Sequence, residues 1–541
     1  MSKKQAPASE KPSLTRRDVL AIGAVAATSL YLPGGLIRSA GAQTSPSGVQ
    51  YNQNVIGKLP DFYVSPTGTG SASSGGTAAN PWPISMLSNP TAQSRYAGHV
   101  VGIMNGTYGL YDIMGLPPAG NFSGDNRLQI KPGTATQPTI IVAQTPQGVI
   151  IDGQRDAIHA AAPTLDWGDG LMGPYTYPYG HTGAGVTIDG LKFVGGNYRY
   201  ITNYGGYGRG GNGDNGCDNL TVRNCWFADL SYITCQAQGK NSSMFYSEGQ
   251  DHIYVQNCRF DGGGAPSDGG RYNSCQFYSP TNDTVIEYCT VISGASNNSW
   301  GGAVYWKSGA GPGHNNPSAR YNYIDCSAMT SQGSRQQGPI SFDGCNTSTS
   351  VFTIYNNILI AALGNPNIYA GPLGQVSGYA GTWDIHDNTF AGNYSSQGNF
   401  FGPWDNLAPV KQNFYRNIIA PSSGGGQNGD FDLAKAGVAG NIDYNLYPTS
   451  VKLCIGNGTS TYTSLSSWRS AVGVDQHSAQ QLPGFAGTGT EAARYMVSGV
   501  AATFAADGGQ IGAWRGTSQV GCSFGGGTVL PVPDAPALSV S

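Results

Sequence analysis

The sequence predicts an all-β solenoid, because one six-residue strand unit recurs along most of its length. The unit, seen for example at 222–227, has nine copies, which begin at positions 188, 222, 255, 286, 319, 354, 385, 414 and 442. Neighbouring copies are 28 to 35 residues apart, a period typical of solenoids. β-Branched and aromatic residues fill the copies, and no apolar period of 3.6 residues is present, which excludes helical repeats.

The fourth position of each copy carries the most specific signal. It is leucine in the first copy, cysteine in the next three and asparagine in the last five: Leu191, Cys225, Cys258, Cys289, Asn322, Asn357, Asn388, Asn417 and Asn445. Strands of successive coils lie about 4.8 Å apart, so equivalent side chains stack. We expect the three cysteines to be buried free thiols, because a single inward position per coil leaves no partner oriented for a disulfide. Asparagine amides can instead bond to one another and to the backbone.

This pattern resembles the right-handed parallel β-helix superfamily that includes the pectate lyases, over roughly residues 61–515. The resemblance implies a single-stranded right-handed parallel β-helix of about twelve coils. Nine coils come from the repeat, and three earlier ones are expected at 99–104, 139–143 and 149–153. Because a solenoid grows along one axis without a new core, we expect one domain in a chain of 541 residues.

The start of the chain reads as an export signal. Residues 1–42 resemble a twin-arginine signal peptide: Arg16 and Arg17 precede an apolar run at 21–37, and small residues at 40–42 fit a cleavage site. The apolar run is too short for a membrane span. We therefore expect the twin-arginine translocase to export the protein to the periplasm or beyond, with no stable membrane insertion.

The remaining boundaries follow from composition. Residues 43–60 are expected to form a linker and 516–541 a C-terminal tail. The segments 465–485 and 509–513 resemble the closing segment of bacterial β-helix enzymes, so we expect them to cover the open end of the helix. The formal net charge of −3 gives no reason to expect nucleic acid as a partner. We expect a monomer.

The ten cysteines show no spacing that would suggest a zinc site. Most are expected to be buried thiols, because they fall on or beside strands. Cys454 and Cys522 lie outside the ladder and are the pair that could form a disulfide.

A second, less regular series of strand segments carries the polar groups. Its members are 232–236, 274–278, 303–307, 339–343, 367–370 and 399–405. Charged residues make up only 11% of the chain, so Lys307, Asp343 and Asp405 stand out on this series. A charge on a strand of a stacked sheet must face outward or find a partner. We therefore expect the functional groups here.

The region around Lys307 resembles the lyase family of alginate lyases and chondroitinase B. A Lys-Ser pair at 307–308 is followed by a strand at 320–326 and by Arg335. In that family the lysine is the base and the arginine is the acid or charge stabiliser, which implies these roles for Lys307 and Arg335. β-Elimination fits the two residue types, because a cation must neutralise the uronate carboxylate while a neutral amine takes the adjacent proton.

The resemblance leaves the metal open. Family members hold calcium with acidic residues shortly before the lysine, whereas residues 300–302 here are Trp-Gly-Gly. Calcium is thus a possibility and no cofactor is certain. The expected catalytic residues are Lys307, Arg335, Tyr305, His314 and Asp343, and the expected substrate-binding residues are Tyr278, Trp306, Arg271, Trp404 and Asp405.

Two other functions stay open. An inverting glycoside hydrolase would use Asp343 and Asp405 as its two carboxylic acids, which matching strands two coils apart would hold about 9.6 Å from each other. The signature motifs of polygalacturonases and pectate lyases are absent from the sequence. The other alternative is a surface β-helix that binds glycan through aromatic residues and catalyses nothing.

Overall fold

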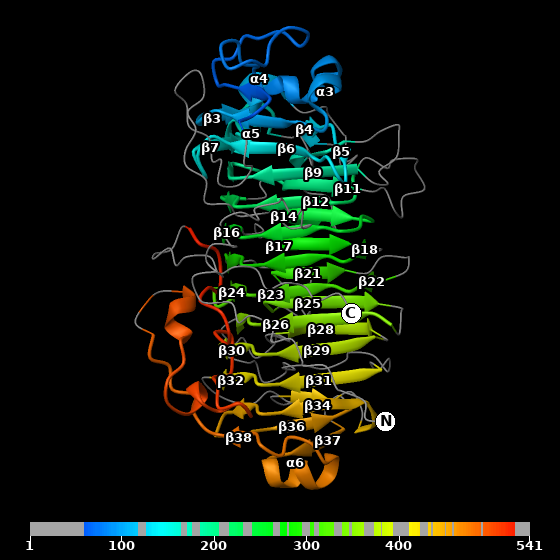
Figure 1. The fold of residues 1–541 in the computed structure, drawn as a ribbon, viewed down its shortest axis with the longest axis vertical. Coiled ribbons are helices and arrows are strands. Elements are labelled where there is room, and N and C mark those ends of the chain that lie inside the picture. Colours follow the sequence, from blue (N-terminus) through cyan, green and yellow to red (C-terminus); the bar gives the residue numbers. More distant parts are fainter. Residues whose placement is uncertain are drawn as a thin grey trace, which may run out of the picture.

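A computed structural model of the chain contains three parallel sheets that wind around one long axis (Figure 1). The structure describes residues 59–116, 126–163, 170–175, 184–204, 216–230, 241–262, 271–278, 281–294, 303–307, 313–328, 338–345, 349–361, 373–379, 381–392, 410–421, 431–433, 436–449, 451–456, 459–487, 489 and 491–524. The chain passes through the sheets in turn, which makes the fold a right-handed parallel β-helix, as the sequence predicts.

The first sheet contains the first strand of every repeat copy. In order along the axis its strands are β1 (Phe62–Val64), β2 (Val100–Ile103), β6 (Thr139–Ala143), β9 (Ala184–Asp189), β12 (Leu220–Arg223), β15 (Tyr254–Gln256), β19 (Val285–Glu287), β23 (Ser318–Arg320), β26 (Val351–Tyr355), β29 (Thr382–His386), β31 (Lys411–Tyr415) and β34 (Ala439–Asp443), with β5 (Gly133–Thr134) antiparallel to β9.

The second sheet contains the other half of each copy. Its strands are β3 (Gly106–Gly109), β7 (Val149–Asp152), β10 (Leu191–Val194), β13 (Trp226–Ala228), β16 (Arg259–Gly262), β20 (Thr290–Ser293), β24 (Tyr323–Asp325), β27 (Ile358–Ala361), β30 (Thr389–Gly392), β32 (Ile418–Pro421), β35 (Leu446–Tyr447) and β38 (Ala479–Gln480).

The third sheet has eight strands in the described part of the chain. They are β4 (Asn126–Ile130), β8 (Gly170–Pro174), β11 (Arg199–Tyr204), β14 (Asn241–Glu248), β17 (Arg271–Tyr278), β21 (Val304–Lys307), β25 (Ile340–Cys345) and β28 (Leu373–Tyr379).

Short elements connect and cover these sheets. The small strands are β18 (Thr281–Asn282), β22 (His314–Asn315), β33 (Phe431–Leu433), β36 (Leu453–Ile455) and β37 (Ser460–Tyr462). The α-helices are α3 (Pro90–Tyr96), α4 (Leu110–Met114), α5 (Arg155–Ala161) and α6 (Leu465–Val472), and the 3-10 helices are η1 (Ile84–Ser88), η2 (Ala436–Val438), η3 (Glu491–Tyr495) and η4 (Gly499–Ala502). No helix among the described residues is long and apolar enough to cross a membrane.

The strand register confirms the predicted alignment of the nine copies. Val222 pairs with Ile188 on one side and Val255 on the other, and the first residues of all later copies pair in the same way, ending with Phe414 and Ile442. Twelve strands follow one another along the first sheet, so the number of coils is as predicted. The residues that form the first three coils differ from the prediction. Residues 139–143 and 149–153 are two strands of one coil, and β1 forms the first coil.

The third residue of every copy adopts a left-handed backbone conformation. Gly190, with φ of +78°, and Asn224, with φ of +54°, are typical, and the other seven residues have φ between +47° and +58°. Glycine, asparagine and aspartate enter this region at little cost, but tyrosine and arginine occupy it in four copies. The conformation bends the chain sharply from the first sheet into the second and turns the fourth residue inward.

The asparagines at the fourth position form a continuous ladder inside the helix. Nδ2 of Asn322 donates to Oδ1 of Asn357 at 2.9 Å, and the same bond joins Asn357 to Asn388, Asn388 to Asn417 and Asn417 to Asn445. Each acceptor oxygen also receives the backbone N–H of the preceding coil. Because all five side chains are fully buried, the ladder satisfies backbone groups that water cannot reach.

The described cysteines are thiols and most of them are buried, as predicted, but the one disulfide considered is not formed. Cys225, Cys258 and Cys289 are buried and free, which confirms the stack of thiols. The bridge considered between Cys454 and Cys522 is not present, because both residues are thiols that form no disulfide. Cys454 lies on β36, near the end of the helix, whereas the backbone N–H of Cys522 donates to Oγ1 of Thr290, at the start of β20.

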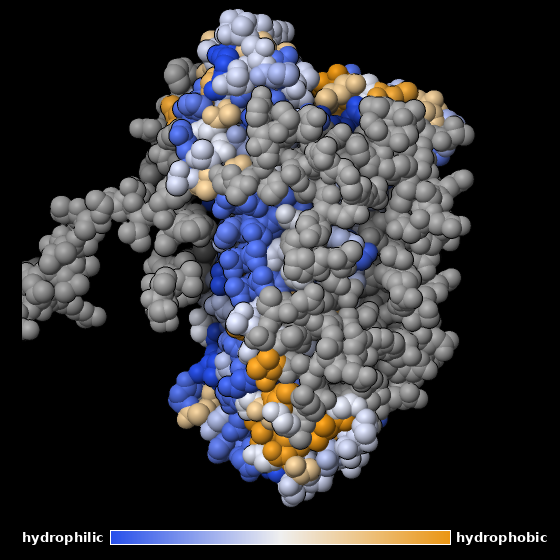
Figure 2. All heavy atoms as spheres, turned by 90° about the vertical axis from the view of Figure 1, so that its right-hand side faces the viewer, coloured by the Kyte–Doolittle hydropathy of each residue, from blue (hydrophilic) through white to orange (hydrophobic). Residues whose placement is uncertain are grey.

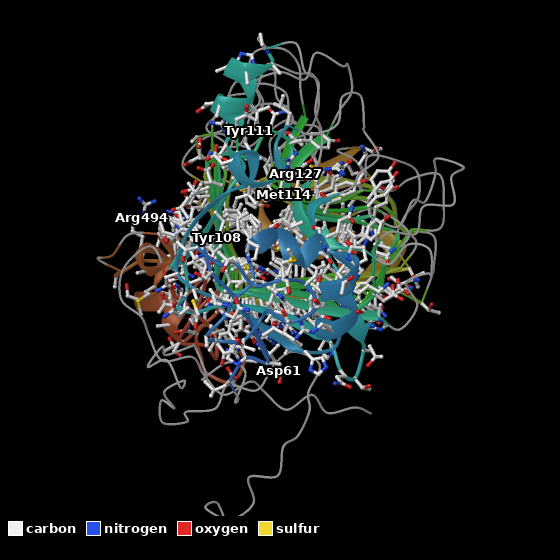
Figure 3. All side chains as sticks on the ribbon, turned by 90° about the horizontal axis from the view of Figure 1, so that it is seen from above. Asp61, Tyr108, Tyr111, Met114, Arg127 and Arg494 are labelled. Carbon is white, nitrogen blue, oxygen red and sulfur yellow. The ribbon has the colours of Figure 1, made fainter. Side chains whose placement is uncertain are left out.

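Local segments cover the two ends of the helix. Figure 3 looks onto the N-terminal end, where Tyr108 is buried and Met114 of α4 packs against the core. At the other end α6 and the loop after it close the core. Asp475 in that loop is almost fully buried and accepts hydrogen bonds from Asn445 at 3.3 Å and Tyr447 at 2.8 Å. Residues 465–485 therefore lie where the sequence predicts a cap.

The C-terminal segment (491–524) runs back along the outer side of the second sheet (Figure 1). Trp514 and Val520 pack against Tyr323 and Ile358 of that sheet. We expected 509–513 to help close the end, but Gly512 donates its backbone N–H to the carbonyl of Arg416, on the side of the helix. Residues 516–524, assigned to the tail, belong to this covering segment.

The corner between the third and first sheets carries its own polar stack. Nδ2 of Asn282 donates to Asp251 at 2.8 Å, and Nδ2 of Asn315 donates to Asn282 at 2.6 Å. Figure 2 views this side and shows hydrophilic surface extending along the axis. The strands β18 and β22 follow β17 and β21 along the chain. Their contacts at this corner hold the ends of these two third-sheet strands.

Candidate functional site

The outer face of the third sheet brings together three of the predicted site residues. Phe277 and Trp306 of β17 and β21 point into the core and are fully buried. Side chains alternate along a strand, so Tyr278, Tyr305 and Lys307 project from the opposite face. We call positions Glu248, Tyr278, Lys307 and Asp343, which pair in register across four strands, the Lys307 row.

Lys307 is half-buried and packs over an aromatic ring. Its Nζ lies 5.3 Å from the centroid of the Tyr278 ring, on the preceding strand. This cation–π contact favours the charged ammonium over the neutral amine. Asp343 has the next register position, but its side chain is outside the described residues.

A second row lies two residues earlier on the same strands. Tyr246, Gln276, Tyr305 and Ser341 pair in register, and we call them the Gln276 row. All four side chains are buried, with Tyr305 exposed by only 6%. The sequence drew attention to Tyr305 alone, because glutamine and serine are common on strands and nothing in their spacing marks them.

A buried acidic group and a buried cation lie on the preceding strands. The guanidinium of Arg199 lies 3.5 Å from the centroid of the Tyr246 ring, and the Tyr246 hydroxyl hydrogen-bonds to the carboxylate of Glu248. Burial raises the pKa of Tyr246 well above its ordinary value, with Arg199 opposing the shift and Glu248 adding to it. The phenol therefore stays protonated and donates to Glu248. Sequence reasoning missed Tyr246 and Glu248, because β14 was not recognised as a strand.

His314 holds the end of β21 instead of facing outward. It is fully buried, with Nδ1 2.7 Å from Oγ1 of Thr281 and Nε2 3.1 Å from the carbonyl oxygen of Lys307. Burial lowers the pKa of His314 to about 3, although the contact with the Lys307 backbone opposes the shift. A neutral ring with both nitrogens engaged positions the strand, so the expected catalytic role of His314 does not fit its place in the fold.

Trp306 also differs from its expected role as a substrate-binding residue. The indole stacks on Phe277 at 5.1 Å between ring centroids, and Nε1 donates to Oγ1 of Thr284 at 2.8 Å. It is fully buried in the core. The ring is therefore part of the packed interior.

The other expected site residues lie partly or wholly outside the described structure. Arg335, Trp404 and Asp405 are outside the described residues. Arg271 is described by its backbone only, as the first residue of β17, where it pairs with Asn241 of β14. The described residues contain no group of three or more His, Cys, Asp or Glu side chains arranged to hold a metal ion.

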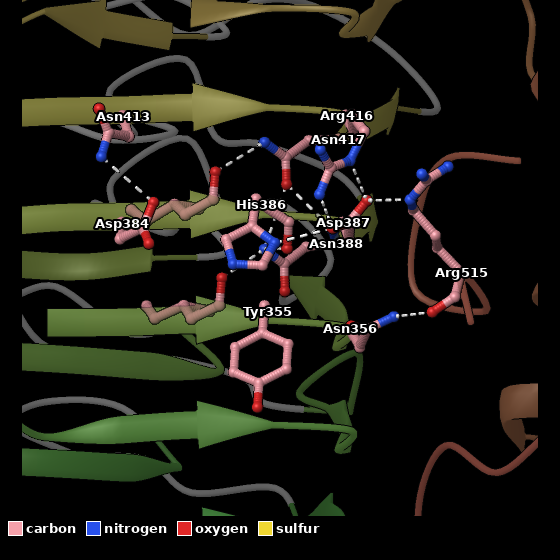
Figure 4. Close-up of polar contacts among 12 residues, drawn as sticks. Tyr355, Asn356, Asp384, His386, Asp387, Asn388, Asn413, Arg416, Asn417 and Arg515 are labelled. Atoms are coloured by element: carbon pink, nitrogen blue, oxygen red, sulfur yellow. Dashed lines mark hydrogen bonds and ion pairs between the residues drawn. The ribbon is translucent and has the colours of Figure 1, made fainter. Parts of the chain in front are cut away.

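A second polar cluster, unanticipated from the sequence, lies where the first sheet meets the C-terminal segment (Figure 4). Asp387 is bound by Nδ1 of His386 at 2.7 Å and by Nη2 of Arg416 at 2.6 Å, and Nε of Arg515 is 3.6 Å away. Burial alone would raise the pKa of Asp387, but hydrogen bonds from Arg416 and His386 lower it. Tyr355 stacks on the His386 ring, with centroids 5.1 Å apart. Because its groups satisfy one another, this cluster serves to dock the segment.

Comparisons with known proteins add little to this geometry. No protein-family model matches the chain, and no curated protein matches it either. Among solved structures, a rhamnogalacturonan lyase is similar at 14% sequence identity with a TM-score of 0.29, covering 68% of this chain and 83% of that one. A likeness this low carries no argument, so the assignment of the fold rests on the strand register.

Proposed function

We propose that the chain is a polysaccharide lyase that cleaves a uronate-containing glycan by β-elimination at the outer face of the third sheet. The observation that carries the proposal is Lys307 itself. It is a half-buried lysine on a face otherwise rich in tyrosine, with its Nζ 5.3 Å from the Tyr278 ring centroid. Isolated lysines on the open surface of a sheet are normally solvated, whereas this one is held in place.

The chemistry requires three roles. The neutral amine of Lys307 takes the proton beside the uronate carboxylate, the bond to the leaving sugar oxygen breaks as the carbon–carbon double bond forms, and an acid protonates that oxygen. We assign the acid to Tyr305, and we propose that Arg335 neutralises the carboxylate. His314 has no part in proton transfer.

This assignment predicts a distinctive pH dependence. The Tyr278 ring favours the ammonium form of Lys307, so the rate should rise toward alkaline pH as the amine forms. Replacing the ring, in Tyr278→Leu, should move the acidic limb of the pH–rate profile to lower pH. A lysine that only neutralised the carboxylate would give the reverse trend, with the rate falling as the ammonium is lost.

The direct test compares two lysines that both lie over aromatic rings. Lys307→Ala should lower turnover by roughly 10²–10⁴-fold, measured by the ultraviolet absorbance of unsaturated ends released from a panel of uronate polysaccharides. Lys192 lies over Trp226 on the second sheet, with Nζ 4.1 Å from the ring centroid, and Lys192→Ala should leave turnover unchanged. Full activity in Lys307→Ala would refute the lyase proposal.

The hydrolase and binding alternatives have their own outcomes. Loss of activity in Asp343→Asn and Asp405→Asn, with Lys307→Ala active and no unsaturated product, would replace the lyase by a hydrolase. Glu248 and Asp343 do not form a hydrolase pair on this face, because three strand spacings separate them by about 14 Å, beyond the inverting range. Glycan binding without turnover would favour a binding protein.

Export by the twin-arginine route is proposed on the sequence of residues 1–42 alone. Replacing both arginines, as in Arg16→Lys with Arg17→Lys, should retain the protein in the cytoplasm, measured by fractionation. Unchanged export of the double variant would contradict this part of the proposal.

A further inference from the structure

The Gln276 row contains buried polar groups that the described chain does not satisfy. Gln276 is fully buried, and neither Oε1 nor Nε2 has a hydrogen-bond partner in the part of the chain that the structure describes. Ser341 is also fully buried, and its Oγ is unpartnered among the same residues. Leaving such a group unpaired costs about 1–3 kcal/mol, so native proteins rarely tolerate it without another binding partner.

The position of these groups points to the face that carries Lys307. Gln276 and Ser341 flank Tyr305 on the two neighbouring strands, about 9.6 Å apart by strand spacing. The adjoining Lys307 row contains Tyr278 and Lys307, which are both half-buried. The unpaired groups are themselves fully buried, and they lie directly beside residues that are only half-buried.

We propose that Gln276 and Ser341 form a sugar-binding subsite that holds hydroxyl groups of the glycan next to the reacting uronate. This inference rests on the proposed function for the identity of the ligand as a glycan. A glutamine amide offers one acceptor and two donors, and a pair of adjacent hydroxyls satisfies both kinds of atom. A carboxylate or phosphate accepts only, so it would leave Oε1 unpaired. The Tyr305 side chain between them would supply apolar contact for a sugar ring.

The proposal predicts opposite effects on stability and on binding. Gln276→Leu removes the unpaired amide, so the midpoint of thermal unfolding should stay the same or rise. It also removes the sugar contacts, so the Kd for uronate oligosaccharides should rise about tenfold or more, as loss of buried hydrogen bonds to a ligand does. Binding is measured by calorimetry in the Lys307→Ala protein, which keeps the oligosaccharide intact.

A matched control lies just beyond the same sheet. Gln250 follows β14, is fully buried, and also has both amide atoms unpartnered among the described residues. It is outside both rows, so Gln250→Leu should leave the Kd unchanged while the unfolding midpoint stays or rises. Ser341→Ala should weaken binding in the same direction as Gln276→Leu, by a smaller factor.

The outcomes separate this inference from the lyase assignment. If Gln276→Leu binds the oligosaccharides as tightly as its parent, the row holds only internal water and the subsite is refuted, whatever the activity of the wild type. If Gln276→Leu weakens binding but the wild type releases no unsaturated ends, the subsite stands and the lyase assignment falls. If no oligosaccharide in the uronate panel binds the parent protein, both are overturned.

Discussion

The outer faces of the second and third sheets differ in whether their buried polar side chains have hydrogen-bond partners. On the second-sheet side, the C-terminal segment covers the helix and supplies partners for several of the groups beneath it, although Nε1 of Trp514 and Oε1 of Gln519 in the segment have none among the described residues. Nδ2 of Asn356 donates to the carbonyls of Ala513 and Arg515, and Arg259 pairs with Glu491 at 2.9 Å. On the third sheet, Gln276 and Ser341 are just as buried and find no partner among the described residues.

The difference separates a structural covering from a binding face. A segment that covers its own chain is encoded in the same sequence as the groups beneath it, so it can supply them with partners, as it does for Asn356 and Arg259. Groups that meet a ligand are matched only when the ligand is bound. Unpartnered buried atoms also occur elsewhere among the described residues, as in Gln250 and Trp514. What distinguishes the third sheet is that Gln276 and Ser341 lie beside Tyr278 and Lys307, which are only half-buried.

Removing the covering should have the largest effect. Deleting residues 491–541 would expose apolar groups that include Ile358 and Ile418, would leave the Asn356 side chain without its partners and would remove Glu491 from Arg259, which would keep only Asp261. At about 2 kcal/mol for each large buried side chain, we expect a loss on the order of 5 kcal/mol or more, together with aggregation. Deleting only 525–541 removes none of these contacts and is the control. Equal stability of the two truncated proteins would contradict a structural role for the segment.

A smaller effect is expected from His314 on the third-sheet side, and only at acid pH. Its folded pKa of about 3 lies below the ordinary value of about 6.5. A depressed histidine pKa contributes stability that is fully present above about pH 6.5 and is lost as the pH falls toward 3. The loss should approach about 1.4 kcal/mol per pH unit in this window.

The measurement for His314 is a difference between two proteins. Denaturant unfolding of the wild type and of His314→Gln, followed from pH 7 to pH 4, should show the wild type losing stability faster. The contributions of carboxylate titration to the free energy of unfolding are the same in both proteins and cancel in the difference. Parallel pH curves would mean that His314 is not buried as a neutral ring between Thr281 and the Lys307 carbonyl.

The smallest effect is expected from a single contact under the covering segment. Asn356 has φ of +54°, which glycine tolerates, so Asn356→Gly removes the side-chain donor without backbone strain. Two backbone carbonyls of the C-terminal segment then lose their partner, and we expect a cost of about 1–3 kcal/mol in unfolding free energy. The same measurement on Gln276→Leu should show no cost. A destabilised Gln276→Leu with an unaffected Asn356→Gly would reverse the comparison.

The ladder could be predicted because its spacing is regular. Each residue of a copy pairs with the same residue of the next, so aligning the copies was enough to obtain the register and the stacks of cysteine and asparagine. The left-handed third position was not predicted, although Gly190, Asn224 and Asn257 at this position favour that conformation. Tyr288 and Arg416 have the same conformation but do not favour it, so the residue types at this position show no uniform preference.

The third sheet was harder to read because the segments before its strands vary in length. β8 and β11 lie in stretches where no strand of this series was predicted, and β14 lies after 232–236, which we expected to be the strand in that coil. Residues 232–236 are outside the described residues, as are 367–370 and 399–405. Without a fixed period, polar strands such as Asn241–Glu248 resemble loops.

The candidate site was predicted in part. Lys307, Tyr305 and Tyr278 share one face, as expected. Alternation along the strand would have excluded Trp306, because it lies between two outward residues. The burial of His314 and the unpaired groups of Gln276 could not be foreseen, because each depends on contacts between residues of different coils.

The most direct test of a ligand face on the third sheet is a crystal structure of Lys307→Ala with a bound uronate oligosaccharide. We predict sugar density over β14, β17, β21 and β25, with hydroxyl oxygens within hydrogen-bond distance of both Gln276 amide atoms and of Ser341 Oγ. Density for the sugar on another face, or a Gln276 amide bonded only to water or protein in the complex, would contradict it.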